Sequence, residues 1–187
     1  MTHINLLGQY ASSRNAEAFA RIIEEYQQFV FATCRRKLHD PADIDDAVQE
    51  TFLRLAQKAG ELHSNLGGWL HRCASNVSID LNRRRSARKA HEAVAASDRK
   101  EGTLNAQQML TELREHLDTA LEKLDPEPRE LIIQRYFVGR QQSELAEELN
   151  VAPSTITHRL ERAIELLRSQ LKMMGTGVLS GAGSGAE

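Results

Sequence analysis

The stretch that decides the fold of this chain is residues 141–171, which read QQSELAEELN followed by VAPSTITHRLERAIELLRSQL. Leu145, Ala146 and Leu149 recur at helical spacing in its first part, and a longer apolar stripe follows. That stripe consists of Ile156, Leu160, Ala163, Ile164 and Leu167. Asn150 lies between the two, where a left-handed backbone is needed, and Pro153 suits the first turn of a helix. The stretch therefore predicts a short helix, a tight turn and a longer second helix, the arrangement of a helix-turn-helix.

The second helix of this motif would expose a polar and basic face. Its members are Ser154, Thr155, Thr157, His158, Arg159 and Arg162. Such a helix fits the major groove of DNA, where residues near its amino end meet base edges and phosphates. An ordinary helical hairpin with solvated side chains shows the same pattern, so the motif alone leaves DNA binding and a structural role both open.

Length and composition favour two small helical domains. A chain of 187 residues with 41% apolar residues has room for one ordinary domain or two small ones. Four prolines and few aromatic residues suit helices better than sheets. The net charge of -2 argues against a protein that coats nucleic acid by bulk electrostatics. We predict an all-α fold of two small helical domains joined by a flexible linker, the second containing the helix-turn-helix.

Several functional classes receive no support from the sequence. Cys34 and Cys73 lie on apolar helix faces, which predicts reduced core residues and a cytoplasmic protein. The seven histidines show no paired ligand spacing, so neither a metal nor another cofactor is expected. No catalytic set or glycine-rich phosphate loop is evident, which argues against an enzyme. A signal peptide and a long apolar run are also missing, so membrane insertion is not expected.

The first domain is predicted at residues 16–92, after a polar lead at residues 1–15. It begins with a long amphipathic helix over about residues 16–38, and an acidic helix follows. Asp40 can cap this helix, with Pro41 at its first position. Its polar surface carries three carboxylates on one face and two neighbouring polar residues: Asp43, Asp46 and Glu50, with Asp45 and Gln49 beside them. The helix dipole accounts for acidic residues in the first turn only. Because the carboxylates continue along the helix, we predict a docking surface for a basic partner.

A basic helix is predicted next, after a loop at residues 60–68. Trp69 would open it, and Arg72 and Asn76 lie off its apolar stripe. The run Arg83, Arg84 and Arg85 would wrap its end in positive charge suited to a phosphate backbone. A solvated basic face and a core tryptophan are equally ordinary interpretations.

The remaining segments complete the predicted organisation. Residues 93–105 are expected to be a linker and residues 106–174 the second domain. The glycine-, serine- and alanine-rich residues 175–187 are expected to be disordered.

Three segments in this order resemble a known family. They are DIDDAVQETFL at residues 43–53, WLHRCASNVSID at residues 69–80 followed by the arginines, and LDPEPREL at residues 124–131 before the helix-turn-helix. Together they resemble the bacterial sigma factors of the extracytoplasmic function (ECF) type, within the sigma-70 family. The resemblance covers residues 16–171.

The resemblance implies a site for each partner. The acidic helix would bind the clamp helices of the RNA polymerase beta-prime subunit, through Asp43, Asp45, Asp46, Gln49 and Glu50. The basic helix and the loop before it would open the minus-ten promoter element and hold an extruded base, whose unstacking costs a few kcal/mol. The residues concerned are Ser64, Asn65, Trp69, Arg72 and Asn76, with Arg83, Arg84 and Arg85 on phosphates. The second domain would contact the beta flap and read the minus-thirty-five element through the exposed residues of its second helix. Regulation by an anti-sigma factor is typical of the family.

Two functions remain to be compared. One is a sigma factor that directs core RNA polymerase to a set of promoters. The other is a free-standing helix-turn-helix regulator that binds operators by itself. The acidic helix favours the sigma factor, because a self-sufficient DNA-binding protein has little use for a face of carboxylates.

Overall fold

The computed structural model describes residues 3–92 and 116–180, and every described secondary-structure element is a helix. The chain divides into two compact units, residues 1–112 and 113–187. The predicted all-α fold with two helical domains is confirmed. The predicted linker, residues 93–105, lies outside the described residues.

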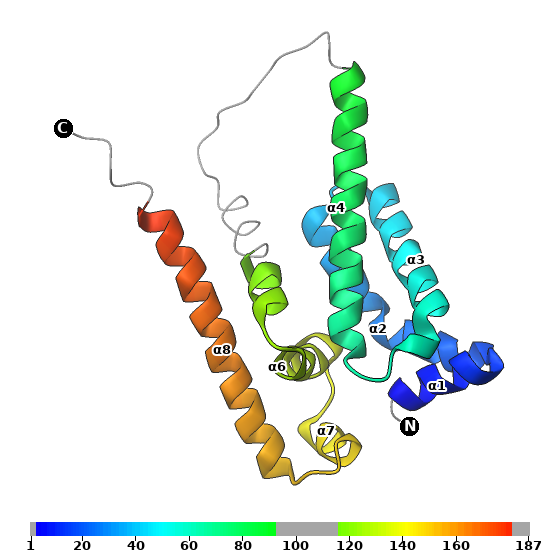
Figure 1. The fold of residues 1–187 in the computed structure, drawn as a ribbon, viewed down its shortest axis with the longest axis vertical. Helices are drawn as coiled ribbons and strands as arrows, with labels where there is room; N and C mark the ends of the chain where they lie inside the picture. Colours follow the sequence, from blue (N-terminus) through cyan, green and yellow to red (C-terminus); the bar gives the residue numbers. More distant parts are fainter. Residues whose placement is uncertain (1–2, 93–115, 181–187) are drawn as a thin grey trace. The chain divides into compact units, whose positions relative to one another are not determined.

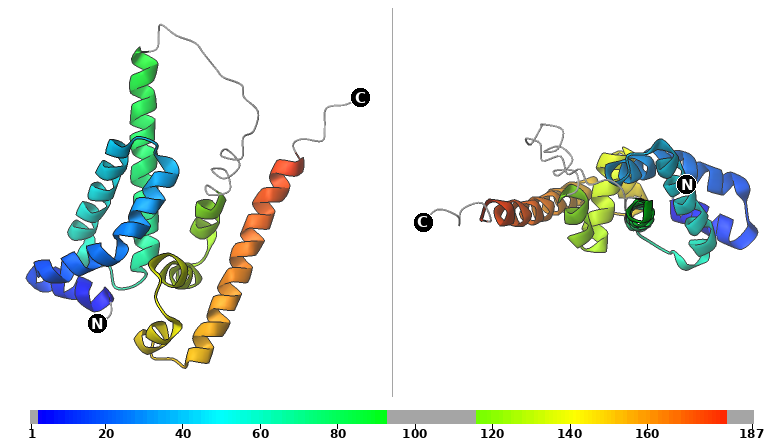
Figure 2. Two further views of the ribbon diagram at one scale, coloured as in Figure 1. Left: turned by 180° about the vertical axis from the view of Figure 1, so that it is seen from behind. Right: turned by 90° about the horizontal axis from the view of Figure 1, so that it is seen from above.

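The helices of the first unit, whose arrangement Figure 1 shows, pack around buried apolar side chains. Its described elements are α1 (His3–Ser13), α2 (Ala16–Lys37), α3 (Pro41–Lys58), η1 (Ala59–Glu61) and α4 (Leu66–Glu92). Helix α4 packs against both α2 and α3, and the views in Figure 2 show the same arrangement. Tyr26, Leu55 and Leu70, one from each of these helices, are completely buried. Since α3 and α4 share this core, their outward faces have a fixed relation to each other.

Local capping explains where two of these helices begin. The side-chain Oδ1 of Asp40 accepts a hydrogen bond of 3.1 Å from the backbone N–H of Ala42, and Pro41 follows at the first position of α3. The predicted start of the acidic helix is therefore confirmed. Helix α4 begins earlier than predicted, at Leu66, and the backbone N–H of Trp69 already donates to the carbonyl of Asn65 at 3.0 Å. The loop before α4 is correspondingly shorter.

The amino-terminal segment is a helix rather than a polar lead without pattern. Leu6 and Leu7 of α1 are almost fully buried, and Tyr10 stacks on Phe19 of α2 with ring centroids 4.4 Å apart. Arg14, in a left-handed conformation with φ 53°, donates to the carbonyl of Ala56 near the end of α3 at 3.3 Å. The sequence analysis missed α1 because two adjacent leucines in a short polar segment give no helical period.

The second unit contains one long helix against which shorter helices pack. Its described elements are a helix over residues 116–123, α6 (Pro126–Ile132), the π-helical turn η2 (Ile133–Val138), α7 (Gln142–Glu148) and α8 (Pro153–Ser180). Helix α8 packs against both α6 and α7. It continues to Ser180, past residue 175 where the sequence analysis placed the start of a disordered tail, because adding residues to a formed helix is easy. Residues 181–187 lie outside the described part.

The helix-turn-helix has the predicted turn. Asn150 adopts φ 51°, and the backbone N–H of Val151 donates to the carbonyl of Ala146 at 3.0 Å. Leu145 and Ala146 pack against Ile156 and Leu160, together with Leu131 of α6. One core prediction is wrong, since Leu149 is 45% exposed. It follows the last turn of α7, beyond the part of that helix that α8 covers.

Arg129 is a buried structural arginine. Its guanidinium donates to the carbonyls of Leu121, at 2.8 Å, and Glu122, at 2.9 Å, and it also donates to Leu124. These carbonyls lie at the carboxyl end of the helix over residues 116–123, where the regular hydrogen bonds of a helix run out. The carbonyl of Leu121 also accepts from the backbone N–H of Leu124 at 3.2 Å. Arg129 thus fixes this helix to α6 and supports the base of the helix-turn-helix.

The two cysteines are buried core residues, as predicted, and both are unoxidised. Burial raises the pKa of the Cys34 thiol to about 11 and also raises the pKa of Cys73, so both stay protonated near neutral pH. Within residues 3–92 and 116–180, no helix is both long and apolar enough to cross a membrane. The same residues contain no cluster of side chains arranged to hold a metal ion.

Candidate functional site

The outward face of α3 carries a mixed acidic and apolar surface. Asp46, Glu50 and Leu53 lie on one face of the helix, spaced by three or four residues. They border a groove of about 560 Å³ between α3 and α4, which we call the α3–α4 groove. Its lining consists of Asp46, Gln49, Glu50, Leu53 and Arg54 from α3 and Val77, Asp80, Leu81 and Arg84 from α4. The groove thus combines three carboxylates and two guanidinium groups with three apolar side chains.

Leu53 is a surface residue that the sequence analysis did not assign to any site. It is 55% exposed, and it also borders a second, apolar groove of about 420 Å³ between α2 and α3. Phe19, Ile23, Val48 and Phe52 contribute to that groove. An exposed leucine between two grooves is a natural centre for a protein interface. The sequence offered one signal for this assignment, since Leu53 lies three residues after Glu50 and therefore on the same face of the helix.

The predicted docking residues do not all share this groove. Gln49 and Glu50 line it, and Glu50 accepts from the guanidinium of Arg54 at 2.7 Å. Asp45 is exposed but is not among the lining residues, since one residue of helix turns it about 100° from Asp46. Asp43 is engaged by an arginine of α4.

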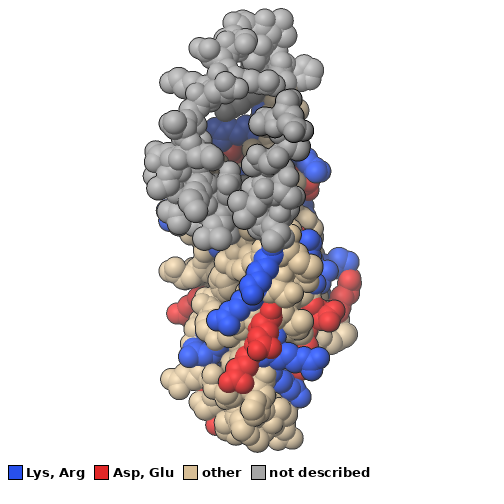
Figure 3. Space-filling view, turned by 90° about the vertical axis from the view of Figure 1, so that its left-hand side faces the viewer, with Lys and Arg blue, Asp and Glu red and all other residues tan. Residues whose placement is uncertain are grey.

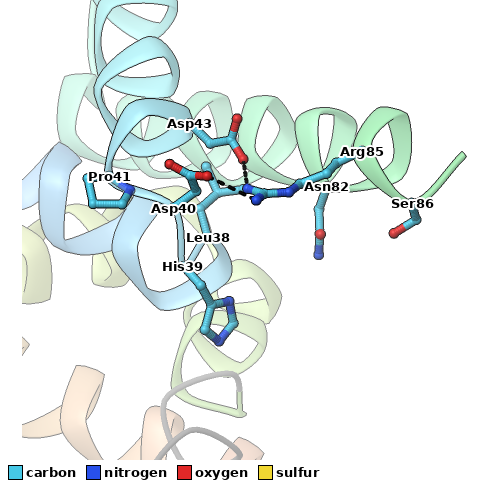
Figure 4. A pocket seen from close by; sticks show the side chains of 8 residues that line it. All are labelled: Leu38, His39, Asp40, Pro41, Asp43, Asn82, Arg85 and Ser86. Carbon is cyan, nitrogen blue, oxygen red and sulfur yellow. Dashed lines mark hydrogen bonds and ion pairs between the residues drawn. The ribbon is translucent and has the colours of Figure 1, made fainter. Parts of the chain in front are cut away.

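That arginine is Arg85, which the sequence analysis had placed on DNA phosphates. Figure 4 shows its guanidinium pointing at the carboxylates of Asp40 and Asp43 at the start of α3. The Asp40 contact is 2.9 Å. Arg84 lines the α3–α4 groove instead, so the three consecutive arginines point in different directions.

One exposed stripe runs along α4. Trp69, half-buried, is followed at intervals of three to seven residues by the exposed side chains of Arg72, Asn76 and Arg83. This spacing keeps them on one side of the helix. The buried residues Leu70 and Ala74 occupy the opposite side. The stripe combines an aromatic ring, an amide and two cations, the side chains that hold an unstacked base and its phosphates.

The loop before α4 has a constrained shape. Ser64 is exposed, and Asn65 is half-buried in a left-handed conformation with φ 57°. A Cβ atom at Gly68 would lie 2.3 Å from the Oδ1 of Asn65, closer than two heavy atoms without a bond can approach. The glycine therefore permits the observed position of Asn65.

The close approach leads to a first prediction. Because the resemblance implies promoter opening at this loop, Gly68→Ala should displace Asn65 and lower promoter opening, with little loss of polymerase binding. Gly8→Ala is the matched control, because it also replaces a helical glycine but meets no atom within 4 Å. It should stabilise the protein by up to about 1 kcal/mol. Thermal unfolding and permanganate reactivity of promoter thymines measure the two effects. Normal opening by Gly68→Ala would show that the position of Asn65 is unimportant.

In the second unit, the predicted DNA-reading residues occupy three sides of α8. Ser154, His158 and Arg162 are exposed at intervals of four residues, with Thr155 beside them. Thr157 faces α7, and its hydroxyl donates to the side-chain oxygen of Gln142 at 3.1 Å. Fewer residues therefore share the outermost face of the helix than the sequence analysis predicted.

Arg159 lies on the other flank. Its guanidinium pairs with Glu127 of α6 at 2.9 Å. Nδ1 of His158 lies 3.4 Å from Oε2 of Glu161. Figure 3, which views the α8 side, shows basic and acidic side chains interspersed on the described surface. The predicted DNA-reading residues of α8 therefore lie among acidic side chains and do not form a uniformly basic patch.

Comparisons with known proteins decide the family. The profile described as Sigma-70 region 2 matches residues 22–88, and that of Sigma-70, region 4 matches residues 114–167. The ECF RNA polymerase sigma factor SigL of Mycobacterium tuberculosis is 31% identical over 173 residues, which cover 88% of this chain and 95% of SigL. The chain belongs to the ECF sigma factors. SigW of Bacillus subtilis, a further ECF sigma factor, is 26% identical over 83% of this chain and 90% of its own length.

A solved structure of CnrH in complex with the cytosolic domain of CnrY covers 91% of this sigma factor and 97% of that chain, at 24% identity and a TM-score of 0.42. The family assignment rests on the sequence matches. As an ECF sigma factor, the protein binds core RNA polymerase and directs promoter recognition, minus-ten melting and transcription initiation. The alternative of a free-standing regulator is set aside, because region 2 occupies the first unit.

Proposed function

We propose that this sigma factor divides its work among three helices. Helix α3 docks on the clamp helices of the polymerase beta-prime subunit, helix α4 opens the minus-ten element, and helix α8 reads the minus-thirty-five element. The observation that carries the proposal is that α3 and α4 present different outward faces from one shared core. Polymerase and single-stranded promoter DNA can therefore bind the first unit at the same time.

The docking surface in this proposal centres on the α3–α4 groove. Asp46, Gln49 and Glu50 supply its polar side, and Leu53 supplies an apolar anchor. Carboxylates at such a surface steer a basic partner and fix its register, and the exposed side chain of Leu53 offers apolar area for a partner to cover. Asp43 and Asp45 are secondary, because neither lines the α3–α4 groove.

The minus-ten surface is the exposed stripe of α4 together with the loop before it. Trp69 supplies a stacking face, Asn76 an amide for base edges, and Arg72 and Arg83 bind phosphates. Ser64 and Asn65 border the extruded base. Arg84 and Arg85 face α3 and are left out of this surface.

The minus-thirty-five surface is the amino-terminal part of α8. Ser154, Thr155, His158 and Arg162 are its central contacts, and Thr157 and Arg159 lie at its edges. The second unit would also contact the polymerase beta flap.

We further propose that the protein acts in the cytoplasm without enzymatic activity of its own, and that an anti-sigma factor regulates it.

The minus-ten assignment yields a prediction for the reconstituted holoenzyme. Arg72→Ala and Asn76→Ala should each lower the yield of open complex by about tenfold, because each removes a contact made only to the unstacked strand. Binding to core polymerase should be unchanged. The yield is measured by permanganate reactivity on a promoter mapped by run-off transcription.

Arg21→Ala is the matched control for Arg72→Ala, since it removes an exposed cation from α2, away from the stripe. It should leave opening unchanged. Full opening by both Arg72→Ala and Asn76→Ala would remove α4 from the minus-ten assignment.

A further inference from the structure

Arg85 connects the two functional helices of the first unit. It projects from α4 into a pocket that includes the start of α3 (Figure 4). One nitrogen of its guanidinium lies 2.9 Å from Oδ2 of Asp40, and the other contacts Oδ2 of Asp43. We call these three residues the Arg85 clasp.

The clasp uses a geometry that only arginine provides. A planar guanidinium presents two nitrogens to two carboxylates at once, whereas a lysine ammonium is a single point charge. Asp40 contributes one oxygen to the clasp while its other oxygen caps α3. Asp43 and Asp40 also raise the pKa of the Arg85 guanidinium, which keeps this group charged.

The clasp lies beyond the apolar contact between α3 and α4. Leu81 is the last partly buried apolar residue of α4 among residues 66–87, and Arg85 follows one turn later. Arg83, the last cation of the proposed minus-ten surface, lies between them and is exposed. The ion pairs therefore add a contact between α4 and the start of α3 beyond this apolar packing.

We propose that Arg85 is a positioning residue for promoter opening, which holds the Arg83-bearing turn of α4 on the amino terminus of α3 and does not bind phosphate. The proposal rests on the proposed function, because it assumes that α3 docks on polymerase and that Arg83 contacts the promoter. A second argument supports it: turning Arg85 toward DNA would leave the carboxylates of Asp40 and Asp43 facing each other without their shared cation.

The test is a double-mutant cycle in the reconstituted holoenzyme, with Arg85→Gln, Asp43→Asn and the double variant. Asp40 is left intact because it caps α3. Each single variant should lower the equilibrium yield of open complex by about two- to fivefold, the range for exposed ion pairs. The double variant should be no worse than Arg85→Gln alone, since the contact with Asp43 is already lost in that variant. Asp43→Asn should lose less than Arg85→Gln, because it retains the ion pair between Arg85 and Asp40. Arg85→Lys should recover part of the loss.

The salt dependence of promoter binding separates positioning from phosphate contact. Arg83→Gln, the matched control, should reduce the slope of log affinity against log salt by about 1, because it removes one phosphate contact. Arg85→Gln should leave the slope unchanged. Thermal unfolding identifies variants that fail to fold. If Arg85→Gln is one of them, Arg85→Lys and Asp43→Asn are compared with the unaltered protein instead.

Two results would overturn the proposal: a reduced slope for Arg85→Gln, or normal opening by Asp43→Asn. A different result would show that the proposed function itself is wrong. If Arg83→Gln and Arg72→Ala both open the promoter normally, α4 is not the melting helix, whatever the cycle gives.

Discussion

Reversing Asp46 and Glu50 to lysine together is expected to weaken binding of core RNA polymerase by roughly a hundredfold, or about 3 kcal/mol. Both carboxylates line the α3–α4 groove, so the change replaces two attractive charges with two repulsive ones at a single docking surface. The fold should remain intact. Glu50 pairs with Arg54 one turn away, and such helical pairs contribute about 0.5 kcal/mol or less.

The control for this variant is Glu24→Lys, which reverses an exposed carboxylate on α2 that lines neither groove. Titration of labelled polymerase with each variant gives the dissociation constants, and circular dichroism checks the fold. An equal loss for Glu24→Lys would mean that net charge, rather than the groove, governs docking. Unchanged binding by the double variant would remove α3 from the docking assignment.

Arg162→Ala is expected to lower the affinity of the holoenzyme for promoters by about tenfold, within the range of 1–3 kcal/mol for a base-reading arginine. The residue lies on the outermost face of α8 in line with Ser154 and His158. Arg159→Ala should act in the same direction but less strongly, because Arg159 already pairs with Glu127.

Promoter fragments with and without the minus-thirty-five element supply the readout, and Arg168→Ala, further along α8, supplies the control. The loss for Arg162→Ala should appear only on fragments that contain the upstream element. Equal losses on both kinds of fragment would indicate that Arg162 contacts only generic phosphate.

Local sequence signals predicted much of this fold. The apolar periods located α2, α3 and α4 and the two helices of the helix-turn-helix, although they missed α1. Asp40, Pro41, Asn150 and Pro153 marked helix starts and a turn that the structure confirms. These residues act through their own backbone or that of close neighbours, so their effect is visible in a short window of sequence.

Contacts between residues distant in the chain were not predictable in this way. Arg85 and Asp43 are 42 positions apart, and a run of three arginines does not reveal which one turns back toward α3. The carbonyls that Arg129 binds likewise depend on how one helix meets the next. Leu53 was assigned to no surface, because its exposure depends on which faces α2 and α4 cover.

The interspersed charges fit a factor whose DNA binding depends on polymerase. Arg85 and Arg159 both pair with carboxylates of their own unit, and the net charge of the chain is -2. Non-specific affinity for DNA depends on the number of phosphates that cations neutralise. The isolated protein should therefore bind DNA weakly, and polymerase would provide the additional contacts.

The most direct test of this account is run-off transcription by purified core polymerase, with and without the protein, on a pool of genomic promoter fragments. The account predicts specific transcripts that appear only when the protein is added, with start sites that share a minus-ten and a minus-thirty-five sequence. It also predicts that these transcripts disappear with the Asp46→Lys and Glu50→Lys double variant. Absence of any added transcript, combined with tight operator binding by the protein alone, would contradict the account.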